Sequence, residues 1–390
     1  MWEITLPRTI ILGEGALDYL EELKGRRALI ITDKTMHSLG VLDQVAKRLE
    51  KAGLEVAVFD EVEPEPSKGT VRRAAQVAHE FGPDWIIGLG GGSCMDVAKA
   101  VFVLYERPDV ALEEISPLVE LGLRKKAKLL NIPTTSGTGA DVTWAIVITN
   151  EAEGRKMELA SREVVADITI LDPALPSTMP PRLTADTAID ALTHAIEAYV
   201  SKWHNDFSDA LALWAIRAVF RYLPRAYENG QDMEARKKLH NAATMAGLAF
   251  SNSQIGLAHA MGHALGALFK VPHGRTVAVF LPYTIEYNAR EPNATNRYAE
   301  IAEALGFGPA PPEELVTKLV EAVRGLLQRV NGPLKVADLG IDKRDYEARL
   351  DTLVDRAMES TGLVANPREP SRDDLARLFT YAYEGRPVDF

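Results

Sequence analysis

The segment Trp85-Ile-Ile-Gly-Leu-Gly-Gly-Gly-Ser-Cys-Met-Asp96 carries most of the information about the fold. Trp85–Leu89 is a short, mainly apolar run that leads into glycines, which is typical of a buried strand. A helix is predicted to follow near Asp96–Tyr105. Glycines between a strand and a helix let the backbone approach a phosphate, and the free N–H groups of the helix start attract anions. The segment therefore indicates a nucleotide-binding turn, although a plain tight turn would use the same residues.

Strands and helices alternate on both sides of this turn. Further strands are predicted at 28–33, 56–59, 128–132 and 168–171, and further helices at 41–52 and 71–81. Such alternation is typical of parallel β-α-β units. We also expect an edge strand over Met1–Arg8 and a hairpin in which 142–149 and 156–160 flank the turn 150–154.

A proline cluster separates this pattern from a helical second half. The prolines are Pro173, Pro176, Pro180 and Pro181, and the helical periodicity beyond them includes 185–199, 209–222 and 234–250. At 390 residues the chain is long enough for two cores. We therefore expect an α/β N-terminal dinucleotide-binding domain with a parallel sheet (1–180), followed by an all-α C-terminal metal-binding domain (181–390).

Composition excludes several classes of function. The formal net charge of -11 argues against nucleic-acid binding, which needs a concentrated basic surface. No run approaches 18 uncharged apolar residues, so no membrane span is expected, and the N-terminus does not resemble a signal peptide. Because Cys94 is the only cysteine, no intramolecular disulfide can form, which favours a cytoplasmic protein.

Two further elements support nucleotide binding. Pro133-Thr-Thr-Ser-Gly-Thr-Gly139 follows a predicted strand, at the sheet edge where open α/β proteins bind ligands. Asp33 ends the first such strand, where a carboxylate can accept hydrogen bonds from an adenosine ribose and repel a 2′-phosphate. This favours NAD over NADP, but Asp33 is equally suited to capping the next helix. The spacing Gly88-x-Gly90-x-x-Ser93 is not a strict dinucleotide fingerprint.

Six of the eight histidines lie between residues 194 and 273. Asp190 and His194 are four residues apart and share a helical face, as do His259 and His263, while His273 stands between a proline and a glycine. An enclosed set of imidazole and carboxylate groups indicates one divalent cation, either Fe(II) or Zn(II). Ala260 replaces the glutamate of a zinc-protease motif, so that alternative is excluded. A Lewis-acid metal beside a dinucleotide predicts hydride transfer.

These motifs resemble the iron-containing (group III) alcohol dehydrogenases. The resemblance follows the chain in order and rests on 90–96, 133–139, Asp190-Ala-Leu-Thr-His-Ala-Ile-Glu197, Gly256-Leu-Ala-His-Ala-Met-Gly-His263, 272–274 and Asn366-Pro367-Arg368. One departure is Glu65-Pro66, where members related to lactaldehyde reductase tend to have Asn-Pro. The region around Ile31-Thr-Asp-Lys34 is similar to that enzyme and supports the use of NAD.

The resemblance implies a role for individual residues. It assigns the metal to Asp190, His194, His259 and His273, and places His263 in the substrate pocket as a candidate catalytic residue. It assigns cofactor contact to Asp33, Gly91, Gly92, Ser93, Thr134, Thr135, Thr143 and Lys156. Glu197 is left open between a group that supports a metal ligand and a surface charge.

The resemblance also implies the cofactors and the substrate. The metal is expected to be Fe(II), with Zn(II) as the alternative, and the dinucleotide NAD, with NADP as the alternative. The substrate is expected to be a small primary alcohol, a diol or the matching aldehyde, and the chain a homodimer. Two rival interpretations are a dehydroquinate synthase-like lyase, which would need a basic pocket, and a non-enzymatic metal- or nucleotide-binding protein.

Overall fold

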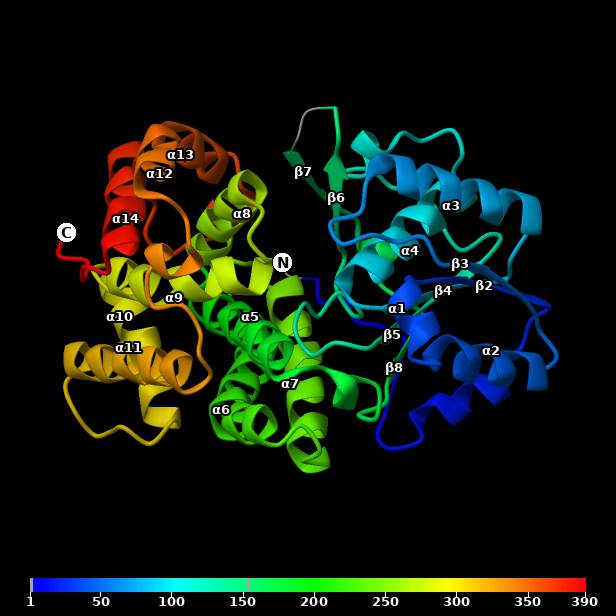
Figure 1. The fold of residues 1–390 in the computed structure, drawn as a ribbon, viewed down its shortest axis with the longest axis horizontal. Coiled ribbons are helices and arrows are strands. Elements are labelled where there is room, and N and C mark those ends of the chain that lie inside the picture. The colour runs from blue at the N-terminus through cyan, green and yellow to red at the C-terminus, as the bar shows by residue number, and fades with distance from the viewer. Residues whose placement is uncertain (1–2, 153–154) are drawn as a thin grey trace. The chain divides into compact units, whose positions relative to one another are not determined.

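The computed structural model describes residues 3–152 and 155–390. The chain divides into two compact units, Met1–Thr178 and Met179–Phe390. The first is an α/β unit and the second is helical, as the sequence predicts (Figure 1). Among the described residues, no helix combines the length and the apolarity needed to cross a membrane.

A six-stranded parallel sheet forms the centre of the first unit. In chain order its strands are β1 (Thr9–Leu12), β2 (Arg27–Ile31), β3 (Glu55–Phe59), β4 (Trp85–Gly90), β5 (Lys128–Pro133) and β8 (Ile168–Leu171). Their order in space is β1-β8-β5-β4-β2-β3, and every neighbouring pair is parallel. The chain thus leaves β2 toward β3 on one side and returns at β4 to build the other side. This reversal between β2 and β4 is where open parallel sheets bind ligands.

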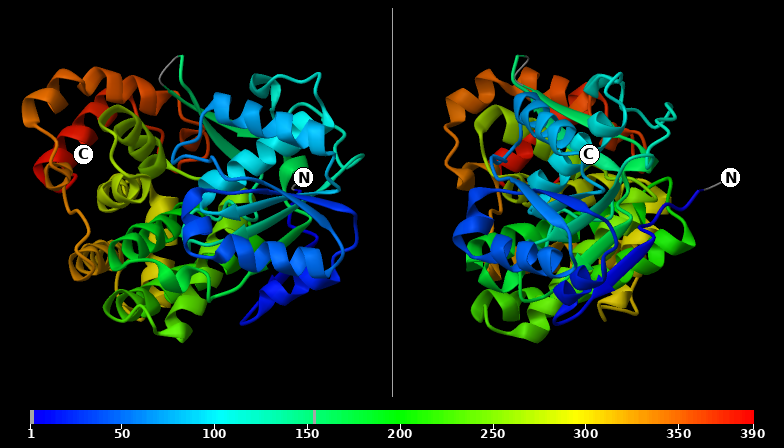
Figure 2. Two further views of the ribbon diagram at one scale, coloured as in Figure 1. Left: turned by 45° about the vertical axis from the view of Figure 1, so that its right-hand side comes forward. Right: turned by 90° about the vertical axis from the view of Figure 1, so that its right-hand side faces the viewer.

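Helices cover both faces of this sheet (Figures 1 and 2). On one face, α3 (Lys68–Phe81) and α4 (Gly92–Glu106) share a core with Leu29 and Ile31. On the other, α2 (Val41–Lys51) and the short helix η1 (Ala16–Glu22) share a core with Ala28 and Ile30. Because successive residues of a strand point to opposite faces, four adjacent apolar residues of β2 serve both cores. Helix α1 (Lys34–Ser38) follows β2 directly.

Two predictions near the edges of this unit had different outcomes. The edge strand predicted over Met1–Arg8 is wrong for the described residues 3–8, and the strand begins instead at Thr9, whose N–H donates to the Asp167 carbonyl (3.1 Å). Pro7 lacks an N–H and so cannot join a ladder as a donor. The hairpin is confirmed: β6 (Ala145–Asn150) and β7 (Arg155–Ala160) are antiparallel. Within its turn, residues 153–154 lie outside the described part.

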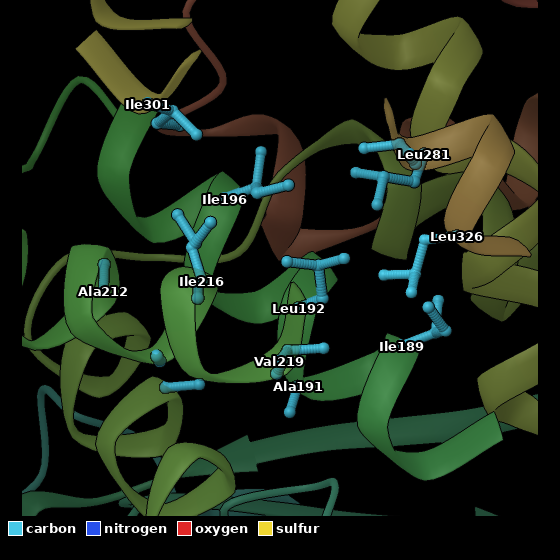
Figure 3. Close-up of a cluster of buried hydrophobic side chains, with 14 of the residues drawn as sticks. Ile189, Ala191, Leu192, Ile196, Ala212, Ile216, Val219, Leu281, Ile301 and Leu326 are labelled. Atoms are coloured by element: carbon cyan, nitrogen blue, oxygen red, sulfur yellow. The ribbon is translucent and has the colours of Figure 1, made fainter. Parts of the chain in front are cut away.

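The second unit is all-helical over the residues described. Its long helices are α5 (Pro181–Val200), α6 (Asp206–Glu228), α7 (Met233–Ser251), α8 (Leu257–Phe269), α9 (His273–Asn288), α10 (Pro292–Ala304) and α11 (Pro312–Arg329), followed by α12 (Lys343–Ala348), α13 (Leu350–Met358) and α14 (Arg372–Glu384). Pro181 opens α5, because a proline at the first helical position loses no hydrogen bond. Figure 3 shows Ile189, Leu192 and Ile196 of α5 within the buried cluster that these helices enclose.

Candidate metal and cofactor sites

Helix α5 presents two polar side chains beside an apolar face. Ile189, Leu192 and Ile196 pack into the core cluster (Figure 3), and the adjacent face carries Asp190 and His194. Both are buried, at 2% and 5% exposure. His194 Nδ1 lies 3.9 Å from Asp190 Oδ1, as expected for residues one turn apart.

Helix α8 contributes His259 through an unusual N-terminus. The cap position is Gly256, which offers no side chain, so Glu197 Oε1 accepts the Ala258 N–H (2.7 Å) and the His259 N–H (3.3 Å). The other oxygen of Glu197 lies 2.5 Å from His259 Nδ1. This contact directs His259 Nε2 toward Asp190 Oδ1, at 3.5 Å. The question left open for Glu197 is resolved: it is buried and holds an imidazole, rather than carrying a surface charge.

Asn366 completes that helix start. Its side-chain oxygen accepts the Leu257 N–H (3.2 Å) and its amide donates to Asn288 Oδ1 (2.8 Å). The sequence alone indicates no role for Asn366, because its partners lie in helices far away along the chain.

Helix α9 begins with His273, whose Nε2 lies 3.4 Å from Asp190 Oδ1. The next residue, Gly274, is pressed against the backbone of α5. A Cβ atom there would overlap the Asp186 carbonyl group, with the carbonyl carbon at 2.8 Å. Only glycine permits this approach, so Gly274 fixes the position from which His273 reaches Asp190.

These side chains converge on one point. The ligand atoms of Asp190, His259 and His273 all lie within 4.8 Å of one another. His194 stands outside that three-residue group, but its ring stacks on that of His259 with centroids 4.2 Å apart. Among the described residues, Asp190 Oδ1, His194 Nδ1 and His259 Nε2 are buried without a hydrogen-bond partner. Such atoms are costly to bury, and a divalent cation would satisfy all three.

The electrostatics of the cluster suit a cation. Burial would raise the pKa of Asp190, but the surrounding histidines hold it well below its usual value. Burial lowers the pKa of His194 well below its usual range. For His259, burial acts to lower the pKa, yet the Glu197 and Asp190 carboxylates raise it to about 9. The aspartate is thus ionised and His194 neutral, the forms in which both bind metals, whereas His259 must release a proton when a cation binds.

His263 lies one turn after His259 on α8. Its ring centroid is 5.0 Å from that of His273 and 5.9 Å from that of His259. It is partly exposed, whereas His259 is buried. The structure therefore brings His263 to the border of the cluster.

The glycine turn lies at the start of α4, as predicted. Gly91 is the N-cap of α4, and Gly92 and Ser93 open its first turn. The Thr134 N–H donates to the Gly90 carbonyl (2.9 Å), which joins the second polar turn to the first. A Cβ atom at Gly92 would lie 2.9 Å from Thr138, so the two turns are in close contact. Thr135 is in ordinary contact range, 3.7 Å from a Cβ built on Gly91.

Asp33 caps α1 at the end of β2. Its Oδ1 accepts the N–H groups of Thr35 (2.7 Å) and Met36 (3.1 Å). Its Oδ2 lies 3.4 Å from the sulfur of Cys94, beside the glycine turn. The capping role is therefore present, and the ribose role of Asp33 stays a prediction.

The two remaining predicted contact residues have charged partners. Thr143 Oγ1 accepts from the Lys99 ammonium group (3.2 Å), which also donates to the Ala145 carbonyl (2.9 Å). Lys156 Nζ forms an ion pair with Glu65 at 3.0 Å. Lys99 is fully buried and holds residues 143–145 in place. The sequence placed Lys99 on the helix after the turn but could not show this function, because its partners follow β5.

Comparison with known proteins covers nearly the whole chain. Residues 7–173 match the family described as iron-containing alcohol dehydrogenase, and residues 184–383 match the C-terminal part of the Fe-containing alcohol dehydrogenase family. The NADPH-dependent butanol dehydrogenase of Clostridium saccharobutylicum is 41% identical, over 100% of both chains.

Solved structures agree with this match. The iron-containing alcohol dehydrogenase of Thermococcus thioreducens is 37% identical, with a TM-score of 0.90 over 99% of this chain and 100% of that one. A 1,3-propanediol oxidoreductase is 32% identical, with a TM-score of 0.92 over 98% of this chain and 100% of that one. Neither the lyase nor the non-enzymatic alternative is supported. The chain belongs to the iron-containing alcohol dehydrogenase family.

Proposed function

We propose that this protein interconverts a small primary alcohol or diol and the matching aldehyde, using NAD and one divalent cation, preferably Fe(II). Family membership makes it an NAD(P)-dependent alcohol dehydrogenase. The observation that carries the metal assignment is the convergence of Asp190, His259 and His273, with orphaned buried atoms pointing at one another. The use of NAD is supported by the Asp33 carboxylate, which would repel a 2′-phosphate.

In the reaction, the side chains of the helical unit would hold the cation and keep its ligands oriented. Asp190, His194, His259 and His273 would hold the cation, and Glu197 fixes the ring of His259 through Nδ1. A divalent cation so bound supplies a Lewis acid that polarises the oxygen of the substrate. Because three of these four ligands are almost fully buried, the electrostatic effects of Asp190 and the imidazoles are weakly screened.

On the cofactor side, Gly91, Gly92 and Ser93 would receive the pyrophosphate at the start of α4. Thr134 and Thr135 lie in the adjoining turn, where their hydroxyl groups can donate to phosphate oxygens. Lys99 keeps Thr143 in position, and Lys156 offers a positive charge. Asp33 would accept hydrogen bonds from the adenosine ribose.

His263 is our candidate for moving a proton between the substrate and water. It borders the cluster and is more exposed than His259. A His263→Asn variant should keep its bound metal but lower kcat, because the amide cannot accept and release the proton. An unchanged kcat would remove this role.

The substrate class is tested directly with the purified protein. It is loaded with Fe(II) or Zn(II) and assayed with NAD or NADP against 1-butanol, 1,2-propanediol and 1,3-propanediol. We expect the highest kcat/KM with Fe(II) and NAD. The diols enter this panel through the similarity to a 1,3-propanediol oxidoreductase, and 1,2-propanediol tests the expected kinship with lactaldehyde reductase. If no metal gives NAD(P)-linked turnover, the proposal is wrong.

We further propose that the protein acts as a homodimer in the cytoplasm. Strand β1 stands at the edge of the sheet, where its last residue, Leu12, is 56% exposed and the preceding Leu6 is 50% exposed. Light scattering in solution measures the mass of the assembly directly. A monomer at micromolar concentration would contradict the dimer.

A further inference from the structure

Glu65 occupies a conformation that glutamate rarely adopts. It is one of four non-glycine residues with positive φ among those described, at φ 56°, and it precedes Pro66. The left-handed region disfavours residues with a long side chain, and asparagine is several-fold enriched there compared with most others. A glutamate at this position therefore calls for a reason.

The hydrogen bonds that attach the loop after β3 to β6 do not explain why position 65 is a glutamate. The loop is already joined to β6 by the Thr149 N–H, which donates to the Pro66 carbonyl (2.7 Å), and by Thr149 Oγ1, which donates to the Glu65 carbonyl (3.1 Å). Both bonds involve the main chain of residues 65–66 and would form with any residue at position 65. The Glu65 carboxylate makes a different contact, which does depend on the residue at position 65.

That carboxylate is directed at Lys156. Lys156 is the partner of Thr149 across the β6–β7 ladder, and its Nζ lies 3.0 Å from Glu65 Oε1. The lysine side chain is 15% exposed and the glutamate side chain 38%. Burial raises the pKa of Asp96 on α4, and the charges of Lys99 and Lys156 act in the opposite direction. The ammonium group of Lys156 itself is held by the Glu65 carboxylate.

We propose that Glu65 sets the affinity of this chain for its dinucleotide cofactor by competing for the Lys156 ammonium group. The inference rests on the proposed cofactor contact of Lys156. An anionic dinucleotide must draw Lys156 away from Glu65, so part of the attraction is lost in breaking an existing pair. A neutral residue at position 65 leaves the ammonium group available.

The test measures dissociation constants for NADH and NADPH by fluorescence titration of the full chain. Glu65→Gln should tighten the binding of both by about two- to fivefold, the range that a half-exposed ion pair supports. The gain should shrink at high salt, because screening weakens the pair. Glu61→Gln is the matched control: it removes the same charge from the same loop, but Glu61 pairs with Arg73 at 3.4 Å.

A second variant separates charge from backbone strain. Glu65→Asn should match Glu65→Gln in cofactor affinity but melt higher by about 2–4 °C, because asparagine tolerates the left-handed region. If only Glu65→Asn tightened binding, relief of strain would be the cause and the competition would be wrong.

Lys156→Met separates the cofactor contact of Lys156 from the competition of Glu65 for its ammonium group. We expect it to weaken NADH binding and to abolish the effect of Glu65→Gln in the double variant. If Lys156→Met binds NADH like the parent chain, the cofactor role of Lys156 fails, and the competition fails with it. If it weakens binding while Glu65→Gln changes nothing, the competition alone is wrong.

Discussion

The turn at the start of α4 and the cluster around Asp190 differ in the atoms they offer to a ligand. The turn offers main-chain N–H groups, with glycines that keep the backbone accessible. The cluster offers side chains from α5, α8 and α9. A site made of backbone survives most substitutions, whereas a site made of side chains depends on each of them. Variants should therefore separate cofactor binding from metal binding.

The strongest test of this difference is His259→Ala. It removes a buried nitrogen that faces Asp190, so bound metal and turnover should both be lost. NADH affinity should stay largely intact. Metal content by atomic absorption and NADH titration measure the two properties separately. His204→Ala is the control, because His204 is exposed and pairs with Asp209. Full turnover of His259→Ala without bound metal would refute the site.

Gly274→Ala tests whether backbone packing positions a side-chain ligand. The new Cβ would overlap the Asp186 carbonyl group and push the start of α9 away from α5. A displacement near 1 Å can cost on the order of 100-fold in rate, and we expect a loss of that size in kcat together with weaker metal binding.

The matched control for that change is Gly325→Ala on α11, where a Cβ meets nothing within 4 Å. It should leave turnover unchanged and stabilise the fold by about 0.5–1 kcal/mol. Equal behaviour of the two alanine variants would show that the close approach at Gly274 is unimportant.

Glu197→Gln tests the contact that orients the metal ligand His259. It removes the carboxylate that orients His259 without removing any of the four proposed ligands. Metal affinity should fall by about 10- to 100-fold, as is typical for such partners of a ligating histidine. Glu228→Gln, which breaks an exposed ion pair with Arg329, serves as the control. Unchanged metal affinity would mean that His259 needs no orienting group.

Asp96 gives the α/β unit a measurable dependence on pH. Burial raises its pKa from 3.8 to about 6. Between these values the folded chain binds a proton that the unfolded chain does not, so stability falls as pH rises through about 6. The change is at most about 3 kcal/mol. Asp96→Asn should lack this change, and urea unfolding of both proteins at pH 4 and 7 measures it. Parallel curves would contradict the assignment.

A smaller effect is expected from Asp33→Gly. Removing the carboxylate should raise the ratio of kcat/KM for NADP over NAD, by about tenfold if one repulsion of 1.4 kcal/mol is lost. The cap of α1 costs only a few tenths of a kcal/mol when glycine replaces aspartate. Asp342→Gly, which removes a similar cap from α12, is the control. An unchanged ratio would mean that Asp33 does not read the ribose.

The sequence predicted the fold well where periodicity and turns are local. The strand at 85–89 is observed as β4 with one more residue, and helix 41–52 as α2 with one fewer. The N-terminal strand was misplaced, because one short edge strand has no periodicity of its own. It forms only through pairing with β8, more than 150 residues later.

In the candidate sites, the sequence predicts which residues share a face of one helix. It does not predict which side chains contact each other between helices. Asp190 and His194 share a face by period alone. That Glu197 reaches across to His259, and that Asn366 caps the same helix start, depends on packing between α5, α8 and the segment before α14. The roles given to the individual ligands and cofactor contacts stay predictions until the variants above are measured.

Cys94 lies buried at the start of α4, where burial and the neighbouring Asp33 raise the pKa of its thiol well above its ordinary value. At neutral pH this thiol stays protonated and shielded from reagents in water. A cysteine introduced on the surface would then be the sole group to react with a maleimide dye or an electrode coating. The chain thus accepts a fluorophore or a point of immobilisation at a chosen position without first losing its native thiol.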